Sequence, residues 1–219
     1  MQLQAADEFF RRLAAERPEP RTELHYANTY TLLVAVVLSA QATDAGVNKA
    51  TKKLFERVKT PQAMLALGEA GLKQHIRTIG LYNAKARNIM ALSKILAERF
   101  GGEVPRNRED LESLPGVGRK TANVLLNSVF GENVIAVDTH VFRVGNRTGL
   151  ARGATPEVVE RRLMKAVPHK WLTHAHHWLI LHGRYVCKAR RPECWHCLVS
   201  DLCAFKEKTP APPNKNGGL

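Results

Sequence analysis

The sequence lacks an apolar run long enough to cross a membrane. Its longest run is Leu32–Leu38, LLVAVVL, whereas a membrane-spanning helix needs about 20 apolar residues. The opening residues, MQLQAADEFFRRLAAERPEP, carry scattered charges and lack the apolar stretch of a secretory signal. Both absences argue against a membrane or secreted protein, so we expect a soluble, cytosolic chain with no membrane partner.

Acidic residues are also in short supply. The chain has 20 Asp+Glu against 33 Lys+Arg, which gives a formal net charge of +13. Such an excess favours a polyanionic partner, and nucleic acid is the first expectation because phosphate contacts supply affinity without regard to sequence. The alternative is a basic surface without a specific partner. With 219 residues, of which 44% are hydrophobic, the chain can form one large domain or two small ones.

Strand patterns and fixed-period repeats are missing as well, and helical patterns dominate. The apolar segment 30–41 could form a buried strand, but no partner strand with alternating polarity is present, so we expect a buried helix. The fold class is therefore predicted to be all-α. Boundaries are expected near Arg21 and Asn133, and the Pro-, Gly- and Asn-rich end, 208–219, is expected to be disordered. The helical patterns cover 5–17, 30–41, 43–58, 83–100, 108–114, 119–130, 138–149, 156–167 and 174–186.

The stretch LPGVGRKTA, residues 114–122, breaks one helix and starts another at once. The proline disfavours helical geometry at Leu114, and the two glycines permit a tight turn. The next helix begins with N–H groups that have no partner inside the helix, so the turn can hold an anion such as a DNA phosphate. The alternative is a plain corner between two helices.

This stretch resembles the helix-hairpin-helix motif of the endonuclease III family of DNA glycosylases. The segment IAVDTHVFRV, residues 135–144, resembles the segment that follows the hairpin in that family. The resemblance implies that Lys120 is the catalytic nucleophile and that Asp138 is its partner. It also implies DNA contacts from the hairpin residues Gly116, Val117, Gly118 and Arg119.

Residue chemistry is compatible with these implied roles. A lysine attacks only as the neutral amine, and Lys120 is expected in the first turn of a helix, near its positive end, with Arg119 beside it. Partial burial would favour the neutral amine in the same way. Asp138 precedes a helical pattern and is expected to cap it as a carboxylate. The alternatives are an exposed lysine that contacts DNA and a purely structural cap.

The cysteines are confined to one short segment, with the pattern C-x6-C-x2-C-x5-C at Cys187, Cys194, Cys197 and Cys203. Cysteines packed this closely in a cytosolic protein indicate a metal site in preference to disulfides. The spacing by itself leaves zinc and an iron–sulfur cluster open. The resemblance to endonuclease III implies a [4Fe–4S] cluster.

Other residues match family positions that fill the gap left by an extruded base. By resemblance these are Gln41 in LSAQATD, and Ile79 and Leu81 in TIGLYN, although apolar residues near a helix end also commonly belong to the core. His140 lies within reach of the site or a phosphate, or else is structural. Two further residues could line the base pocket, Ser39 and Asp44.

The resemblance covers residues 20 to 207 and implies two helical domains. These are a six-helix barrel at 22–132, with the hairpin at 107–130, and an iron–sulfur domain formed by 1–21 with 133–207. The implied activity is that of a base-excision-repair glycosylase and AP lyase, which removes oxidised pyrimidines through a lysine Schiff base and cleaves 3′ to the abasic site. The alternatives are a monofunctional adenine glycosylase and a non-catalytic DNA-binding iron–sulfur protein. The expected partner is double-stranded DNA with damaged bases or abasic sites, bound by a monomer in the bacterial cytoplasm, at the nucleoid.

Overall fold

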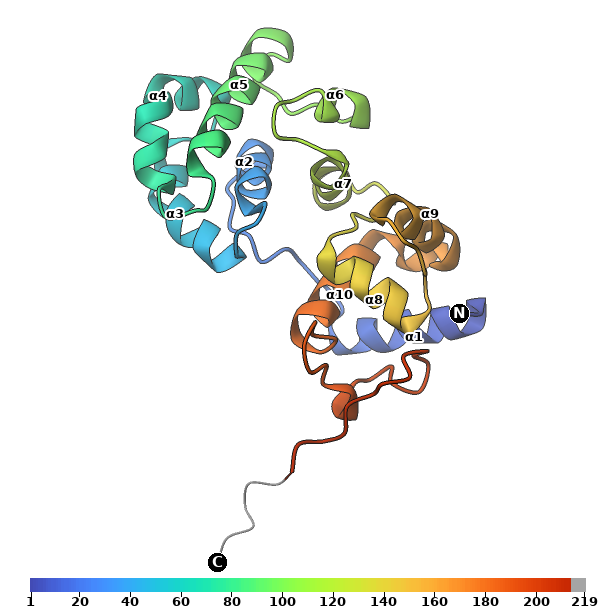
Figure 1. The fold of residues 1–219 in the computed structure, drawn as a ribbon. Coiled ribbons are helices and arrows are strands. Elements are labelled where there is room, and N and C mark those ends of the chain that lie inside the picture. Colours follow the sequence, from blue (N-terminus) through green and yellow to red (C-terminus); the bar gives the residue numbers. More distant parts are fainter. Residues whose placement is uncertain (214–219) are drawn as a thin grey trace, which may run out of the picture. The chain divides into compact units, whose positions relative to one another are not determined.

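A computed structural model describes residues 1–213. The described residues form helices and no strand, which confirms the all-α expectation (Figure 1). Among these helices, none combines the length and the apolar character that a membrane span requires. The α-helices are α1 (Leu3–Glu16), α2 (Thr29–Ser39), α3 (Asp44–Arg57), α4 (Pro61–Ile76), α5 (Tyr82–Arg99), α6 (Arg108–Glu112), α7 (Arg119–Ser128), α8 (Thr139–Thr148), α9 (Pro156–Ala166) and α10 (Leu172–Tyr185).

The chain divides into two compact units. Residues 22–132 form one, which we call the hairpin unit, and it contains α2 to α7. The other, which we call the cysteine unit, combines residues 1–21 with the chain from Asn133 onward and contains α1, α8, α9 and α10. The cysteine unit is therefore discontinuous in sequence.

Helix α2 forms the centre of the hairpin unit. It packs against α3, α5 and α7, and all of its residues from Tyr30 to Leu38 are buried. The side chain of Asn28 accepts a hydrogen bond from the Thr31 N–H, and Thr31 bonds back to the Asn28 backbone, so a capping box starts the helix. The expectation of a buried helix is confirmed and the strand alternative is wrong, because this cap commits the apolar run to helical geometry.

Threonine caps begin three other helices, as their sequence signals predict. The hydroxyls of Thr43, Thr60 and Thr155 accept the N–H groups of Gly46, Ala63 and Val158, at 3.1, 3.2 and 3.4 Å. These bonds satisfy N–H groups at the starts of α3, α4 and α9 that lack partners within their helices.

Helix α1 joins the core of the cysteine unit across a long sequence separation. Phe9, Phe10 and Leu13 pack in one apolar cluster with Trp178 of α10 and Val141 of α8. Since these side chains are almost entirely buried, apolar burial holds the first helix against the second half of the chain.

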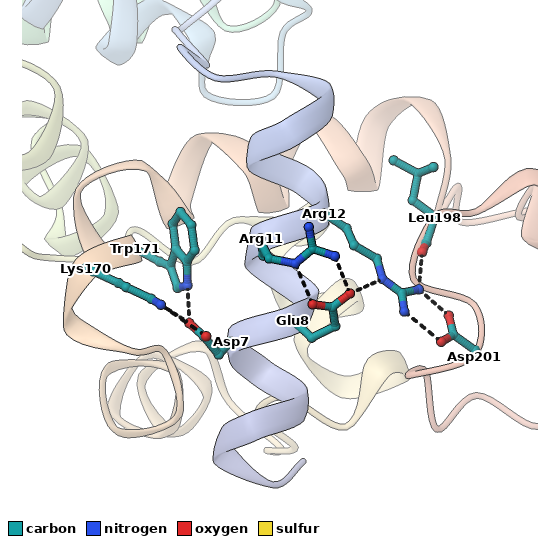
Figure 2. Close-up of polar contacts among 8 residues, drawn as sticks. All are labelled: Asp7, Glu8, Arg11, Arg12, Lys170, Trp171, Leu198 and Asp201. Carbon is teal, nitrogen blue, oxygen red and sulfur yellow. Dashed lines mark hydrogen bonds and ion pairs between the residues drawn. The ribbon is translucent and has the colours of Figure 1, made fainter.

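Polar contacts on the exposed side of α1 add to this packing (Figure 2). The guanidinium of Arg12 donates to both carboxylate oxygens of Asp201, at 2.6 and 3.0 Å, and to the Leu198 carbonyl at 2.8 Å. Elsewhere on α1, the Asp7 carboxylate accepts the Trp171 indole N–H at 2.7 Å and forms an ion pair with Lys170. Helix α1 is thereby tied both to the start of α10 and to the segment that carries the last cysteines.

The expected disordered end, 208–219, lies partly outside the described residues, since 214–219 are not described. Residues 208–213 belong to no helix. Thr209 nevertheless contacts the cysteine segment, because its hydroxyl donates to the Pro192 carbonyl.

Candidate active site and metal centre

The hairpin lies between α6 and α7. Gly116 has a φ of +82°, which favours glycine, and a Cβ added there would lie 3.0 Å from the Asn88 side chain of α5. Gly118 is the N-cap residue of α7 and has no side chain to block the N–H groups of the first turn. The turn thus brings a helix N-terminus to the surface of the hairpin unit.

Val117 packs into the turn. Its N–H donates to the Leu114 carbonyl at 3.0 Å, and its side chain is buried. The expected contact between Val117 and DNA stays a prediction.

Lys120 lies in the first turn of α7 and is exposed, as is Arg119. Residues 122–127 are buried on all sides of the helix, so the lysine is exposed because it lies in the first turn, before the buried part of α7 begins. Its expected place at the positive end of a helix is confirmed. Its side chain is exposed, so burial does not favour the neutral amine in this structure.

Asp138 is the N-cap of α8, as the sequence predicts. Its carboxylate oxygen accepts the Val141 N–H at 2.8 Å, and its backbone is extended. The side chain is half-buried. The carboxylate is therefore held in a defined orientation by the helix that it caps.

Close packing of α8 against α10 places this cap. A Cβ added at Gly183 of α10 would lie 2.8 Å from the Cβ of His140, so only glycine allows this approach. His140 itself is half-buried, and its Nδ1 lies 3.2 Å from a guanidinium nitrogen of Arg143. The same guanidinium donates to the Gly183 and Cys187 carbonyls, at 2.8 and 2.9 Å. Arg143, which sequence reasoning missed, thus joins the Asp138 helix to the start of the cysteine segment.

Two short loops of the hairpin unit carry the candidate gap-filling residues. Gln41 and Leu81 both adopt left-handed backbone geometry, with φ of +54° and +59°, and both side chains are exposed. Leu81 is 62% exposed, which is unusual for a large apolar residue, whereas Ile79 is 4% exposed and packs in the core. Leu81 therefore presents an apolar side chain to solvent, and a direct contact between Ile79 and DNA stays a prediction.

The two weaker pocket candidates flank Gln41. The hydroxyl of Ser39 donates to the Val36 carbonyl of its own helix at 2.8 Å. Asp44 is the first residue of α3, and both residues are half-buried. Their backbones lie at the two ends of the Gln41 loop.

Lys85, near the start of α5, was also missed by sequence reasoning. It is 5% exposed, and its ammonium donates to the Leu38 carbonyl at 2.9 Å. Burial lowers its pKa. The signal that could have revealed it is its place four residues before Ile89, in the apolar stripe of α5.

The four cysteine side chains are half-buried and line one cavity of the cysteine unit. Burial raises the pKa of Cys197 to about 11 and also raises that of Cys203, so their thiolates need a compensating positive charge. Within residues 1–213, no three His, Cys, Asp or Glu side chains converge on a point that a single metal ion could occupy.

Nitrogen atoms surround the cysteine sulfurs. The Arg147 guanidinium and the His182 Nε2 each lie 3.7 Å from a sulfur, that of Cys187 and that of Cys197 respectively. The Phe205 N–H donates to the sulfur of Cys203 at 3.5 Å. Such contacts are typical of the shell that stabilises thiolate ligands.

Comparison with known proteins gives two family matches. Residues 34–169 match the HhH-GPD superfamily of base excision DNA repair proteins, and residues 187–203 match the iron–sulfur binding domain of endonuclease III. The chain is 57% identical over 205 residues to endonuclease III of Rickettsia conorii, covering 94% of this chain and 98% of that one. It is also 57% identical over 201 residues to endonuclease III of Escherichia coli K12, with 92% and 95% covered.

The chain belongs to the endonuclease III family. It is therefore a base-excision-repair enzyme that acts on DNA, both as a glycosylase and as a lyase, with the all-α fold of the helix-hairpin-helix glycosylases. The expected family, fold class and activity are confirmed.

Solved structures agree with this assignment. A trapped endonuclease III–DNA covalent intermediate, in an estranged-adenine complex, has a TM-score of 0.87 and 47% identity over 93% of this chain and 96% of that one. A thermostable thymine-DNA glycosylase has a TM-score of 0.82 and 25% identity, covering 92% and 96%. For this endonuclease III-family chain, the cysteine segment is an iron–sulfur binding domain, and the zinc alternative is set aside.

Proposed function

We propose that this endonuclease III-family enzyme removes oxidised pyrimidines from double-stranded DNA by nucleophilic attack of Lys120. The Lys120 amine forms a bond to C1′ of an extruded nucleotide while the bond from C1′ to the base breaks, and the base leaves with a proton. Ring opening leaves a Schiff base between Lys120 and the sugar. Loss of a proton from C2′ then expels the 3′ phosphate by β-elimination.

The observation that carries this proposal is the position of Lys120. It is an exposed amine in the first turn of α7, directly after the glycine turn. A phosphate on the N–H groups of Gly118 and Arg119 would hold the DNA backbone next to this amine. Arg119 adds a cation that attracts the same backbone.

Asp138 is proposed as the carboxylate partner of Lys120. A half-buried, capped carboxylate can stabilise positive charge on the sugar or accept the lysine proton. His140, two residues later in the first turn of α8, is proposed to contact a DNA phosphate.

Gln41 and Leu81 are proposed to fill the gap left by the extruded nucleotide. The Gln41 amide offers both a donor and an acceptor to the unpaired base, and the exposed Leu81 side chain can wedge between stacked base pairs. Ser39 and Asp44 are proposed to line the pocket for the extruded base.

The cofactor is proposed to be a [4Fe–4S] cluster held by the four cysteines. Cys187, Cys194, Cys197 and Cys203 line one cavity and would supply the four thiolate ligands of such a cluster. The iron atoms supply the positive charge that the buried thiolates of Cys197 and Cys203 require. The cluster orders the segment 187–203, while the residues of the proposed chemistry lie elsewhere in the chain. We further propose that the enzyme acts as a monomer on the bacterial nucleoid.

The test compares Lys120→Gln with Arg119→Gln, a matched control that removes the neighbouring cation. Each variant is incubated with duplexes that contain thymine glycol, an abasic site or adenine opposite 8-oxoguanine, with and without borohydride. We expect the parent chain to act on the first two, and Lys120→Gln to lose base release and borohydride trapping. Arg119→Gln should bind DNA less tightly and still be trapped. Trapping by Lys120→Gln, or activity confined to adenine opposite 8-oxoguanine, would contradict the proposal.

A further inference from the structure

Lys85 is buried between the end of α2 and the start of α5, and each of these helix ends is followed or preceded by one of the proposed gap-filling residues. Its ammonium donates to the carbonyl of Leu38 in the last turn of α2. Its main-chain N–H makes the first hydrogen bond of α5, to the carbonyl of the N-cap Leu81 at 3.0 Å. The side chain therefore bonds three positions before Gln41, from a backbone position in the first turns after Leu81.

The acceptor on α2 is a carbonyl that the helix leaves available. The Ala42 N–H, which would bond to Leu38 if α2 continued, bonds instead to Ser39 at 3.0 Å. The last turn of α2 contains no basic residue of its own. Lys85 therefore supplies, from another helix, the cation that a helix C-terminus favours.

The two loops are neighbours. A Cβ added at Gly80 would lie 3.9 Å from the carbonyl oxygen of Gln41. Gln41 and Leu81 are both non-glycine residues in left-handed geometry, each of which costs about 1 kcal/mol or more. Strained residues of this kind persist only where their surroundings hold them.

Burying an ammonium against a neutral carbonyl costs desolvation free energy. Helices α2 and α5 are already joined by another hydrogen bond. The Tyr30 hydroxyl, near the start of α2, lies 2.6 Å from the Ser93 hydroxyl of α5 and is buried. Simple attachment of the two helices thus does not require the lysine. What the Lys85 contact adds is a fixed position of the Gln41 loop relative to the Leu81 loop.

We propose that Lys85 is a positioning residue for duplex DNA, which holds Gln41 and Leu81 in the relative arrangement needed to fill the gap left by an extruded nucleotide. This inference rests on the gap-filling roles proposed above for those two residues. It predicts that Lys85 matters when a base pair must be opened and is dispensable when the DNA has no opposite strand.

The experiment measures single-turnover cleavage of an abasic site in duplex DNA and in the same single strand. We expect Lys85→Met to lower the ratio of the duplex rate to the single-strand rate by about tenfold. Gln41→Ala and Leu81→Ala should lower the same ratio. Tyr30→Phe, which removes a buried hydrogen bond between the same two helices, should leave the ratio unchanged. Lys85→Gln, which is neutral but keeps a donor, serves as the second variant if Lys85→Met does not fold, and should lower the ratio less.

An unchanged ratio for Lys85→Met, or equal losses on both substrates, would overturn the inference while Gln41→Ala and Leu81→Ala still lower the ratio. If those two variants leave the ratio unchanged, the proposed gap filling fails and the inference fails with it. Loss of trapping in Lys120→Gln reports separately on the proposed nucleophile. A double variant, Lys85→Met with Leu81→Ala, should be no worse than the more impaired single variant, because both changes affect one arrangement.

Discussion

Asp138 has two roles that substitutions can separate. Its carboxylate caps α8 through the Val141 N–H at 2.8 Å, and it is also the proposed partner of Lys120. Asparagine caps a helix about as well as aspartate, whereas alanine does not. Asp138→Asn should therefore lose only the interaction of the charge with the helix dipole, about 0.5 kcal/mol of unfolding free energy. Asp138→Ala should lose the capping bond as well, for a total of about 1.5 kcal/mol.

Activity should fall equally in the two variants, since both substitutions remove the carboxylate. Single-turnover base release is expected to fall by about 10²- to 10⁴-fold in each. Unfolding in urea can be followed by tryptophan fluorescence, because the three tryptophans, Trp171, Trp178 and Trp195, all lie in the cysteine unit with Asp138. The reasoning is refuted if Asp138→Asn keeps its activity, or if it destabilises the cysteine unit as much as Asp138→Ala does.

Three further outcomes concern the cysteine unit. Burial lowers the pKa of His177 from 6.5 to about 3, so below pH 6.5 the unfolded state binds a proton that the folded state does not. The free energy of unfolding should then fall by about 2 kcal/mol between pH 7.5 and pH 5. Urea unfolding at a series of pH values should show a smaller fall for His177→Gln than for the parent chain. Cys203→Ser should lose iron and the visible absorbance that dithionite bleaches, and make 187–203 sensitive to protease, while a protease-resistant fragment spanning 22–132 remains. Arg12→Leu should speed iron loss to a chelator relative to Arg11→Leu, because Arg12 bonds to Asp201 and Leu198 while Arg11 bonds only to its helix neighbour Glu8.

Features that depend on neighbouring residues could be predicted from the sequence. The caps at Thr43, Thr60 and Asp138 follow from short signals, because the accepting oxygen and the donating N–H lie three residues apart. The break at Leu114 follows from the proline after it. The close spacing of the cysteines indicates a metal site in the same way.

Features that depend on distant partners could not. Lys85 has the residue type of a surface position, and its burial follows from the Leu38 carbonyl of another helix. Whether Ile79 or Leu81 faces solvent depends on the left-handed turn at Leu81. In both cases the deciding contact is set by the folded chain, and the local pattern offers at most the place of Lys85 in the apolar stripe of α5.

The divided cysteine unit has a consequence for synthesis on the ribosome. Helix α1 emerges first, yet Phe9 and Phe10 find their partners only after α8 and α10 have been translated. Residues 22–132 are translated earlier and can fold while the apolar side of α1 is still exposed to solvent or bound by a chaperone. Nascent chains stopped when residue 132 has just left the ribosomal exit tunnel should therefore protect 22–132 from protease and leave α1 cleavable, and release of the full chain should protect both.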